Sequence, residues 1–290
     1  MLNRAGVAMK RFDAFARLHR TRFLQARYGA LVAATLALPA TAQAGDLVTA
    51  CTRLNICYCV NSDYRDAISA NVARVRQLIA NNKLRGKAIG YLSIPLSPAG
   101  GGSFAINSEI SAKIAENVLA RFGARSTYLL NPGTEAGDKM GGASGADFMY
   151  MWTQILEGNA GLGEDFDFFY FAGPTDFGKY FFLTGQGDLE RLEAWFDTRA
   201  AQDPSFKKAI DQGNITKSGF RNYYGLRASV AYSYGSHDEW NIARLLNERR
   251  RGATDFGIAA QLPVLFDGQA VNPGSYEAPT ASGDVGRCIN

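Results

Sequence analysis

The sequence predicts an α/β protein in which a mostly parallel sheet lies between two layers of helices. Three observations support this fold class. Segments typical of helices and strands alternate from residue 64 to residue 172, which indicates right-handed βαβ units. The segment 166–172 is apolar almost throughout, as expected of a strand that is covered on both faces. A second helix–strand unit follows late in the chain, at 237–250 and 261–266.

The first elements are predicted from apolar spacing and from glycine. Apolar side chains recur at helical spacing over 64–82, and Gly86 follows this helix. The segment 87–98 has the composition of a buried strand that runs into a turn containing proline. A second helix is expected to begin at a cap formed by Asn107 or Ser108 and to end at Gly123.

The middle of the chain continues the alternation. A strand is predicted at 126–131, and a glycine-rich loop, 137–145, leads from it into the next helix. The strand at 166–172 then completes the third unit. Large apolar side chains here and further on, namely Trp152, Trp195 and the run 168–171, are expected to belong to the hydrophobic core.

The last third departs from this regular order. Residues from about 177 to 232 are mostly helical in pattern and are predicted to form an insertion. The helix 237–250 and the strand 261–266 return to the sheet, and the Pro-, Gly- and Ser-rich segment from about 268 to 290 is predicted to be an irregular tail. Residues 45–290 are thus expected to form a single α/β domain.

Residues 1–44 have the features of a secretory signal peptide. Seven basic residues precede an apolar stretch at about 28–39, and an Ala-x-Ala pattern ends at Ala44. The apolar stretch is too short to cross a bilayer as a helix. We therefore expect an exported protein, periplasmic or secreted after cleavage of the leader, with no stable membrane insertion.

The basic net charge of the chain comes from this leader. The whole sequence carries 31 Lys and Arg against 27 Asp and Glu, and the leader holds 7 of the former and 1 of the latter. Residues 45–290 therefore carry 24 basic and 26 acidic side chains, a net charge of −2. No basic stripe remains that would predict a nucleic-acid partner. The small-molecule substrate that we expect follows from the motifs described below. The oligomeric state is left open.

All four cysteines, Cys51, Cys57, Cys59 and Cys288, follow the leader. An even number in an exported chain predicts two disulfides, and a bridge from the first three to Cys288 would join the two ends of the domain. The alternative is a metal site. The spacing Cys-x5-Cys-x-Cys is not typical of zinc, and no histidine is near, so disulfides are favoured and no metal is predicted.

Several enzyme motifs are absent from the sequence. There is no P-loop, no G-x-G-x-x-G after a strand, no HExxH and no Cys-x-x-Cys, so no cofactor is predicted. In open parallel sheets, ligands bind beyond the carboxyl ends of the strands. The expected strand ends are rich in Gly, Pro, Ser, Asn and Asp: 95–103, 131–145, 173–176 and 267–268.

The segment 233–241, Ser-Tyr-Gly-Ser-His-Asp-Glu-Trp-Asn, collects chemically active side chains at the start of a predicted helix. It contains a glycine turn, a capping serine, two carboxylates and His237. The other histidine of the chain, His19, lies in the predicted leader. This segment is therefore the first candidate for a site.

The order of short motifs resembles that of nucleoside 2-deoxyribosyltransferases and their relatives. The motifs are Ile94-Pro95-Leu96-Ser97, Asn107, Leu130-Asn131-Pro132, Asp167 with Gly173-Pro174 after it, Gly235-Ser236-His237-Asp238-Glu239 and Pro263-Val264-Leu265. The resemblance covers about residues 87–267 and implies a flavodoxin-like (Rossmann-like) α/β fold. The insertion 177–232 stands where this family has a short loop.

This resemblance implies cleavage or transfer at the N-glycosidic bond of a nucleoside-like substrate. Glu239 would be the nucleophile that forms a glycosyl ester, and Asp238 or His237 would assist proton transfer. The remaining residues expected to bind substrate are Ser93, Pro95, Ser97, Asn131, Asp167, Gly173, Asp176, Gly235, Ser236 and Trp240.

Alternative interpretations of the same residues stay open. Ser236 and Glu239 have the spacing of a capping box, in which both side chains would only satisfy helix amides. His237 can be an ordinary surface histidine. The corresponding alternative function is a non-catalytic exported module that binds a small ligand or a protein partner. Whether Glu239 faces a pocket or its own helix separates the two.

Overall fold

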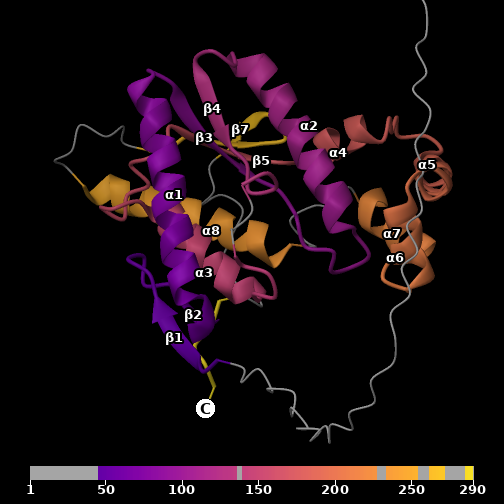
Figure 1. The fold of residues 1–290 in the computed structure, drawn as a ribbon. Helices are drawn as coiled ribbons and strands as arrows, with labels where there is room; N and C mark the ends of the chain where they lie inside the picture. The colour runs from indigo at the N-terminus through magenta and orange to yellow at the C-terminus, as the bar shows by residue number, and fades with distance from the viewer. Residues whose placement is uncertain (1–44, 136–138, 227–232, 254–260, 272–284, 290) are drawn as a thin grey trace, which may run out of the picture. The chain divides into compact units, whose positions relative to one another are not determined.

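The computed structural model describes residues 45–135, 139–226, 233–253, 261–271 and 285–289 (Figure 1). Residues 44–290 form one unit. The predicted leader, 1–44, lies outside the described residues, and so do parts of the predicted insertion and of the predicted tail.

A five-stranded sheet has the strand order β4-β3-β5-β6-β7. Its strands are β3 (Ala88–Ser93), β4 (Thr127–Leu130), β5 (Phe168–Phe171), β6 (Val264–Phe266) and β7 (Gln269–Val271). β3 pairs in parallel with both β4 and β5, β5 pairs in parallel with β6, and only β7 is antiparallel to its neighbour. The predicted mostly parallel sheet is confirmed.

The described part of the chain contains eight α-helices. They are α1 (Arg65–Leu84), α2 (Phe104–Phe122), α3 (Gly145–Glu157), α4 (Pro174–Tyr180), α5 (Asp188–Gln202), α6 (Pro204–Asp211), α7 (Lys217–Gly225) and α8 (Tyr234–Gly252). A short 3-10 helix (Ser62–Tyr64) precedes α1. Helices α4 to α7 form the described part of the predicted insertion.

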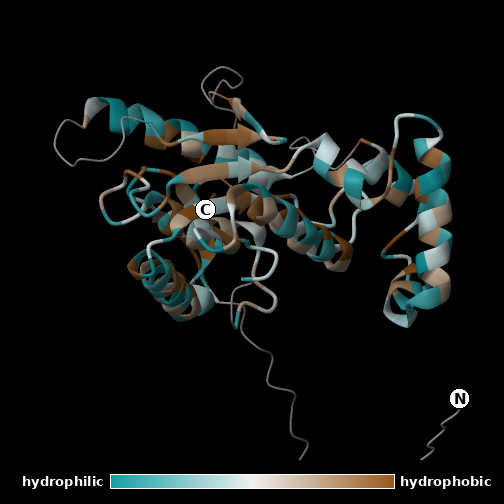
Figure 2. Cartoon of the chain, turned by 90° about the horizontal axis from the view of Figure 1, so that it is seen from above, coloured by the Kyte–Doolittle hydropathy of each residue, from teal (hydrophilic) through white to brown (hydrophobic). Residues whose placement is uncertain are grey.

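Helices cover both faces of the sheet. Neighbouring residues of a strand point to opposite faces, and here the residues on both faces are apolar, so each face packs against helices. Tyr91 and Phe169 lie in a core that includes side chains of α1, α3 and α8. Leu92 and Tyr170 lie in a second core with side chains of α2 and of α4 to α7. The strands are mostly brown in Figure 2, whereas the helices alternate brown and teal along their length. The three-layer α/β class predicted from the sequence is therefore confirmed.

The N-terminal part forms a hairpin that the sequence analysis did not predict. β1 (Leu47–Cys51) pairs antiparallel with β2 (Cys57–Asn61). A disulfide joins Cys51 to Cys57, and a second joins Cys59 to Cys288. The predicted pair of disulfides and the predicted link between the two ends are thus confirmed.

The predicted tail begins with structure that the sequence analysis missed. Asp267 and Gly268 both have positive φ, 51° and 81°, and they form a two-residue turn between β6 and β7. Asp-Gly is favoured in such turns because both central positions need left-handed backbone. The dipeptide therefore continues the chain into a strand, whereas we expected it to end the ordered sheet.

Helix α2 begins four residues before the predicted cap. Ser103 caps it by accepting a hydrogen bond from the Ile106 amide, and Gly123 ends it as expected. Asn107 is buried in the first turn and uses its side chain for contacts outside the helix. Among the described residues no helix is both long and apolar enough to cross a membrane.

Candidate functional site

A cavity of about 220 Å³ lies where the ends of β3 and β4 meet the first turns of α3 and α8. This is the carboxyl edge of the sheet, where ligands bind in open parallel α/β folds. The residues that line it are Ile94, Leu96, Ser97, Phe104, Pro132, Gly145, Phe148, Met149, Trp152, Ser233, Gly235, Ser236 and Glu239.

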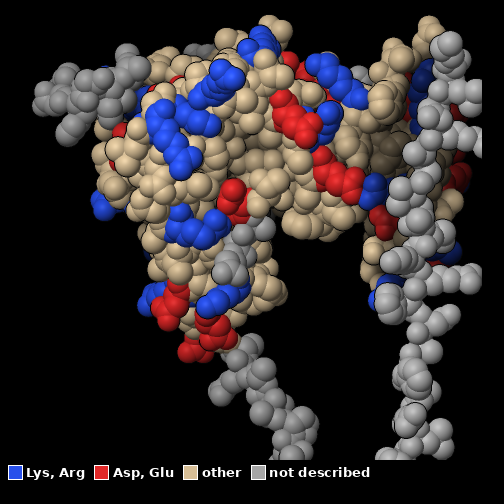
Figure 3. Space-filling view, turned by 45° about the horizontal axis from the view of Figure 1, so that its top comes forward, with Lys and Arg blue, Asp and Glu red and all other residues tan. Residues whose placement is uncertain are grey.

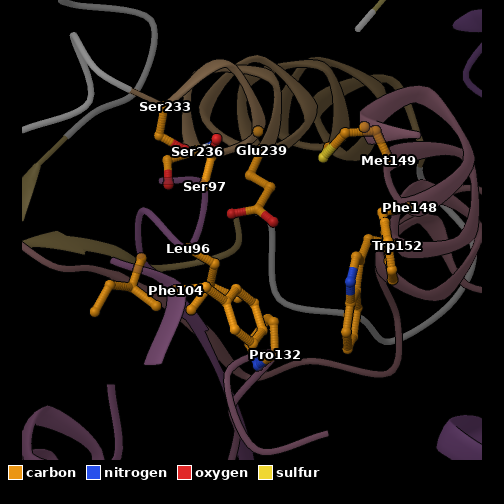
Figure 4. A pocket seen from close by; sticks show the side chains of 13 residues that line it. Leu96, Ser97, Phe104, Pro132, Phe148, Met149, Trp152, Ser233, Ser236 and Glu239 are labelled. Atoms are coloured by element: carbon orange, nitrogen blue, oxygen red, sulfur yellow. Dashed lines mark hydrogen bonds between the residues drawn. The ribbon is translucent and has the colours of Figure 1, made fainter. Parts of the chain in front are cut away.

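Glu239 supplies the carboxylate of this cavity. It lies in the second turn of α8, is 6% exposed, and directs its side chain into the space between the lining residues (Figure 4). The hydroxyl of Tyr91, on β3, donates a hydrogen bond to Glu239 Oε1 at 2.5 Å. Because Tyr91 is fully buried, no water competes for this bond.

The start of α8 differs from the predicted capping box. Ser233 is the cap, and its hydroxyl accepts a hydrogen bond from the Ser236 amide at 3.1 Å. Ser236 therefore lies within the first turn, and the Glu239 carboxylate bonds to Tyr91 instead of reaching back to a helix amide. The interpretation of Glu239 as a simple cap does not hold.

Burial raises the pKa of Glu239 from 4.5 to about 7. The nearby negative charge of Asp238 also raises the pKa, while Ser93 and Tyr91 lower it by stabilising the charged carboxylate. The Ser93 oxygen makes no hydrogen bond of ordinary geometry with a described residue, so we take Tyr91 as the donor that holds the carboxylate. Burial also raises the pKa of Tyr91 well above 10, which keeps this donor protonated.

The two sides of the cavity differ in polarity. Figure 4 shows Ser97, Ser233 and Ser236 on one side of the Glu239 carboxylate, and the apolar side chains Phe148 and Trp152 on the opposite side. Apolar pockets with a few converging polar groups are typical of small-molecule sites. A ligand can therefore meet hydroxyl groups on one side of Glu239 and aromatic side chains on the other, with Leu96 and Phe104 adding apolar contacts on the side of the serines.

A buried network holds the loop that follows β3. Asn107 Nδ2 donates to the carbonyl oxygens of Leu96 and Ser97, both at 3.3 Å, and Asn107 Oδ1 accepts from the hydroxyl of Tyr224 at 2.7 Å. Tyr224 lies on α7, so the helical insertion fixes the position of a loop that lines the cavity. The insertion therefore supports the site from outside.

We expect Asn107→Ala to lower the free energy of unfolding by about 1–3 kcal/mol. The substitution leaves the buried Tyr224 hydroxyl without its acceptor and removes the Asn107 donor from the Leu96 and Ser97 carbonyls, of which Ser97 keeps a bond from the Tyr223 hydroxyl. Urea unfolding followed by fluorescence measures the change. Asn81→Ala is the matched control, because Asn81 is exposed on α1 and should change stability by less than about 0.5 kcal/mol. Equal effects of the two substitutions would contradict the role of the network.

Several residues predicted from the sequence come together at the cavity. Ser97, Gly235, Ser236 and Glu239 line it, and Ser93 lies close enough to act on the Glu239 carboxylate. Two further predicted residues are neighbours of lining residues without lining the cavity themselves: Pro95 and Asn131. Asn131 is buried, donates to the Ser111 hydroxyl and accepts from the Gly133 amide.

The other predicted residues of α8 are not among those that line the cavity. His237 is half-buried and Asp238 is buried, and neither lines the cavity. Trp240 packs edge-on against Phe171, with ring centroids 4.7 Å apart, so its ring belongs to the core. Of these three, Asp238 influences the site through its charge, which raises the pKa of Glu239.

Three predicted residues near β5 do not line the cavity. Asp167 precedes β5 at the opposite edge of the sheet, where it accepts a hydrogen bond from the Ile89 amide. Gly173 and Asp176 lie at the start of α4, and Asp176 accepts from the Tyr170 hydroxyl. Burial raises the pKa of Asp176, and its carboxylate also accepts from the Gly173 amide at the start of α4.

The sequence analysis missed much of the apolar wall. Phe104, Phe148 and Met149 line the cavity without having been predicted there, and Trp152 lines it although it was assigned to the core. The spacing of Phe148 and Trp152, four residues apart, places both on one face of α3 and is the signal that could have found them. The sequence analysis also gave no indication that the hydroxyl of Tyr91 would hold Glu239.

Basic and acidic side chains both occur on the face shown in Figure 3, with wide uncharged areas between them. Three arginines, Arg249 to Arg251, lie in the last turn of α8, and Arg250 is buried and donates to the carbonyl oxygens of Leu162 and Gly163. The guanidinium group of Arg250 therefore links α8 to the loop that contains Leu162 and Gly163.

Comparison with known proteins identifies no relative. No family model matches the sequence, and neither a curated protein nor a solved structure does. The function must therefore be inferred from the cavity and its residues.

Proposed function

We propose that the protein cleaves the N-glycosidic bond of a small nucleoside-like substrate, or transfers its glycosyl group, with Glu239 as the nucleophile. The observation that supports this most directly is a buried carboxylate, held by Tyr91, that faces a cavity with one polar side and one aromatic side. The cavity volume of about 220 Å³ is small for a ligand site, which favours a small substrate.

The proposed reaction has two steps. In the first, the Glu239 oxygen that does not accept from Tyr91 attacks the anomeric carbon, and a C–O ester bond forms while the C–N bond breaks. The base leaves with the electron pair and takes a proton from water. In the second step, water or hydroxide attacks the anomeric carbon, the ester C–O bond breaks, and the carboxylate returns. With a second base as acceptor, the same step gives transfer.

Glu239 is the only ionisable side chain among the described residues that line the cavity. Asp238 and His237, which were expected to assist the leaving base, would act from positions outside the lining. With its pKa at about 7, Glu239 is partly ionised near neutral pH, and Tyr91 stabilises the ionised form needed for attack.

The direct test is incubation of the purified protein with a panel of nucleosides and chromatography of the products. The proposal predicts released base and, with a second base present, an exchanged nucleoside. Failure to release base from any nucleoside over a range of pH would contradict it.

Tyr91→Phe should move the acid limb of the activity profile to higher pH. The hydroxyl of Tyr91 lowers the pKa of Glu239 by a hydrogen bond, so its removal leaves burial to raise that pKa further. A pH profile of kcat/KM for base release measures the shift. Tyr58→Phe removes another buried hydroxyl, one that contacts Thr153, and should leave the profile in place. An unchanged acid limb in Tyr91→Phe would contradict the assigned contact.

The alternative function is a binding module that uses the same cavity. It is favoured by the single ionisable group in the lining and by the raised pKa of Glu239, which lets the neutral carboxyl donate a hydrogen bond to a ligand. Saturable binding of a nucleoside without turnover would support this alternative. In both cases the two disulfides fit an oxidising compartment, and we propose that the protein works after export.

A further inference from the structure

Ser236 brings an unpartnered hydroxyl to the cavity. Its side chain is 3% exposed and lines the cavity from the first turn of α8. The Ser236 amide donates to the cap Ser233, but Ser236 Oγ makes no hydrogen bond with any described residue. Most buried polar groups in folded proteins have a partner, because an unpaired one costs free energy. Among the described buried side-chain atoms without a partner, Ser236 Oγ is the one whose residue lines the cavity, so a ligand atom is its candidate partner.

Ser236 also has a fixed relation to the proposed nucleophile. It precedes Glu239 by three residues, so the two side chains lie on the same face of α8 with Cβ atoms about 5–6 Å apart. Two more serines lie on the same side of the Glu239 carboxylate (Figure 4). Ser233 Oγ accepts from the Ser236 amide, and Ser97 Oγ accepts from the Ala99 amide, so each hydroxyl keeps a proton to donate.

We infer that Ser236 binds a hydroxyl group of the substrate and makes the site selective for a glycosyl group that carries it. The inference rests on the proposed function, since it takes the carbon attacked by Glu239 as the reference point. The spacing of Ser236 and Glu239 places the recognised hydroxyl on a carbon one or two bonds from the anomeric carbon. In a nucleoside these are the 2′- and 3′-hydroxyls. The base then lies toward Phe148 and Trp152, on the apolar side.

The test uses calorimetric titration with adenosine, uridine and their 2′-, 3′- and 5′-deoxy analogues. Binding is measured in a Glu239→Gln background, which prevents turnover. One of the two analogues, the 2′-deoxy or the 3′-deoxy nucleoside, should bind roughly tenfold more weakly than the parent nucleoside. This factor corresponds to the loss of one hydrogen bond. Loss of the 5′-hydroxyl should change binding by less than about threefold. Adding Ser236→Ala should remove the tenfold difference.

Stability measurements provide the structural control. Ser236→Ala removes a hydroxyl that has no partner among the described residues, so the melting temperature should not fall. Ser233→Ala removes the cap of the same helix and should lower it. A fall of the melting temperature in Ser236→Ala would show a structural bond and overturn the inference.

The binding outcomes separate this inference from the proposed function. Equal binding of all analogues, discrimination that survives Ser236→Ala, or no binding of either nucleoside overturns the inference. Hydroxyl discrimination that depends on Ser236, together with no release of base by the wild-type protein, supports the inference and contradicts only the proposed reaction.

Discussion

Replacing Glu239 with glutamine should abolish the release of base while the protein stays folded. The neutral amide cannot form the glycosyl ester, but its oxygen can still accept the hydrogen bond from Tyr91. The cap of α8 is also kept, because Ser233 supplies it. Product chromatography measures the activity, and near-ultraviolet circular dichroism reports the packing of the aromatic core.

The same substitution should change how stability depends on pH. The folded-state pKa of Glu239 is raised from 4.5 to about 7, so between these values the folded protein binds a proton that the unfolded chain has released. The stability due to this proton is fully present below pH 4.5 and is lost as the pH rises through 7. Its size is on the order of 3 kcal/mol. Glutamine does not titrate, so Glu239→Gln should be more stable than the wild type above pH 7.

Glu248→Gln is the matched control on the same helix. Glu248 is exposed and pairs with Arg244, a mostly buried side chain one turn earlier on the helix. Helix pairs at this spacing contribute about 0–1 kcal/mol. This variant should keep both the activity and the pH dependence of stability of the wild type. Base release by Glu239→Gln at the wild-type rate would exclude the nucleophile. Unchanged stability from pH 5 to pH 8 would show that Glu239 does not titrate as described.

The sequence was sufficient for the layers of the fold because burial leaves a strong pattern. The run 168–171 is apolar at every position, and in the structure each of these side chains is buried, alternately in one core and in the other. The cysteines were similarly informative, since an even number of them in a chain with an expected leader predicted the two disulfides that the structure contains. The hairpin at 47–61 was missed because its strands are short and half-exposed, so their alternation is weak.

The site was predictable only in part, because local rules allow two outcomes at the start of α8. Both Ser233 and Ser236 can cap a helix, and sequence spacing favoured Ser236 with Glu239. The choice depends on Tyr91, which is 148 residues away and offers Glu239 a buried donor. Such a contact arises from the packing of α8 against β3 and has no local signature. The same holds for the Asn107 and Tyr224 pair, which depends on the insertion.

Removing the disulfide between Cys59 and Cys288 should destabilise the protein more than removing the one between Cys51 and Cys57. The first closes a loop with a sequence separation of 229 residues and the second one of 6. In the chain-entropy account the cross-link restricts the unfolded chain, and the stabilisation grows with the logarithm of loop length. This relation gives about 5 kcal/mol for the long loop and about 2 kcal/mol for the short one.

The measurement is urea unfolding of two double variants, Cys59→Ser with Cys288→Ser and Cys51→Ser with Cys57→Ser. Each removes one disulfide and leaves no unpaired thiol. The long-range variant also frees the segment around Cys288, whose amide donates to the Thr49 hydroxyl, so the folded state loses contacts as well. Both effects lower the free energy of unfolding, so the larger decrease is expected for Cys59→Ser with Cys288→Ser. Equal decreases in the two variants would mean that the long cross-link restricts the unfolded chain no more than the short one does. The stabilising role assigned to the link between the two ends would then be wrong.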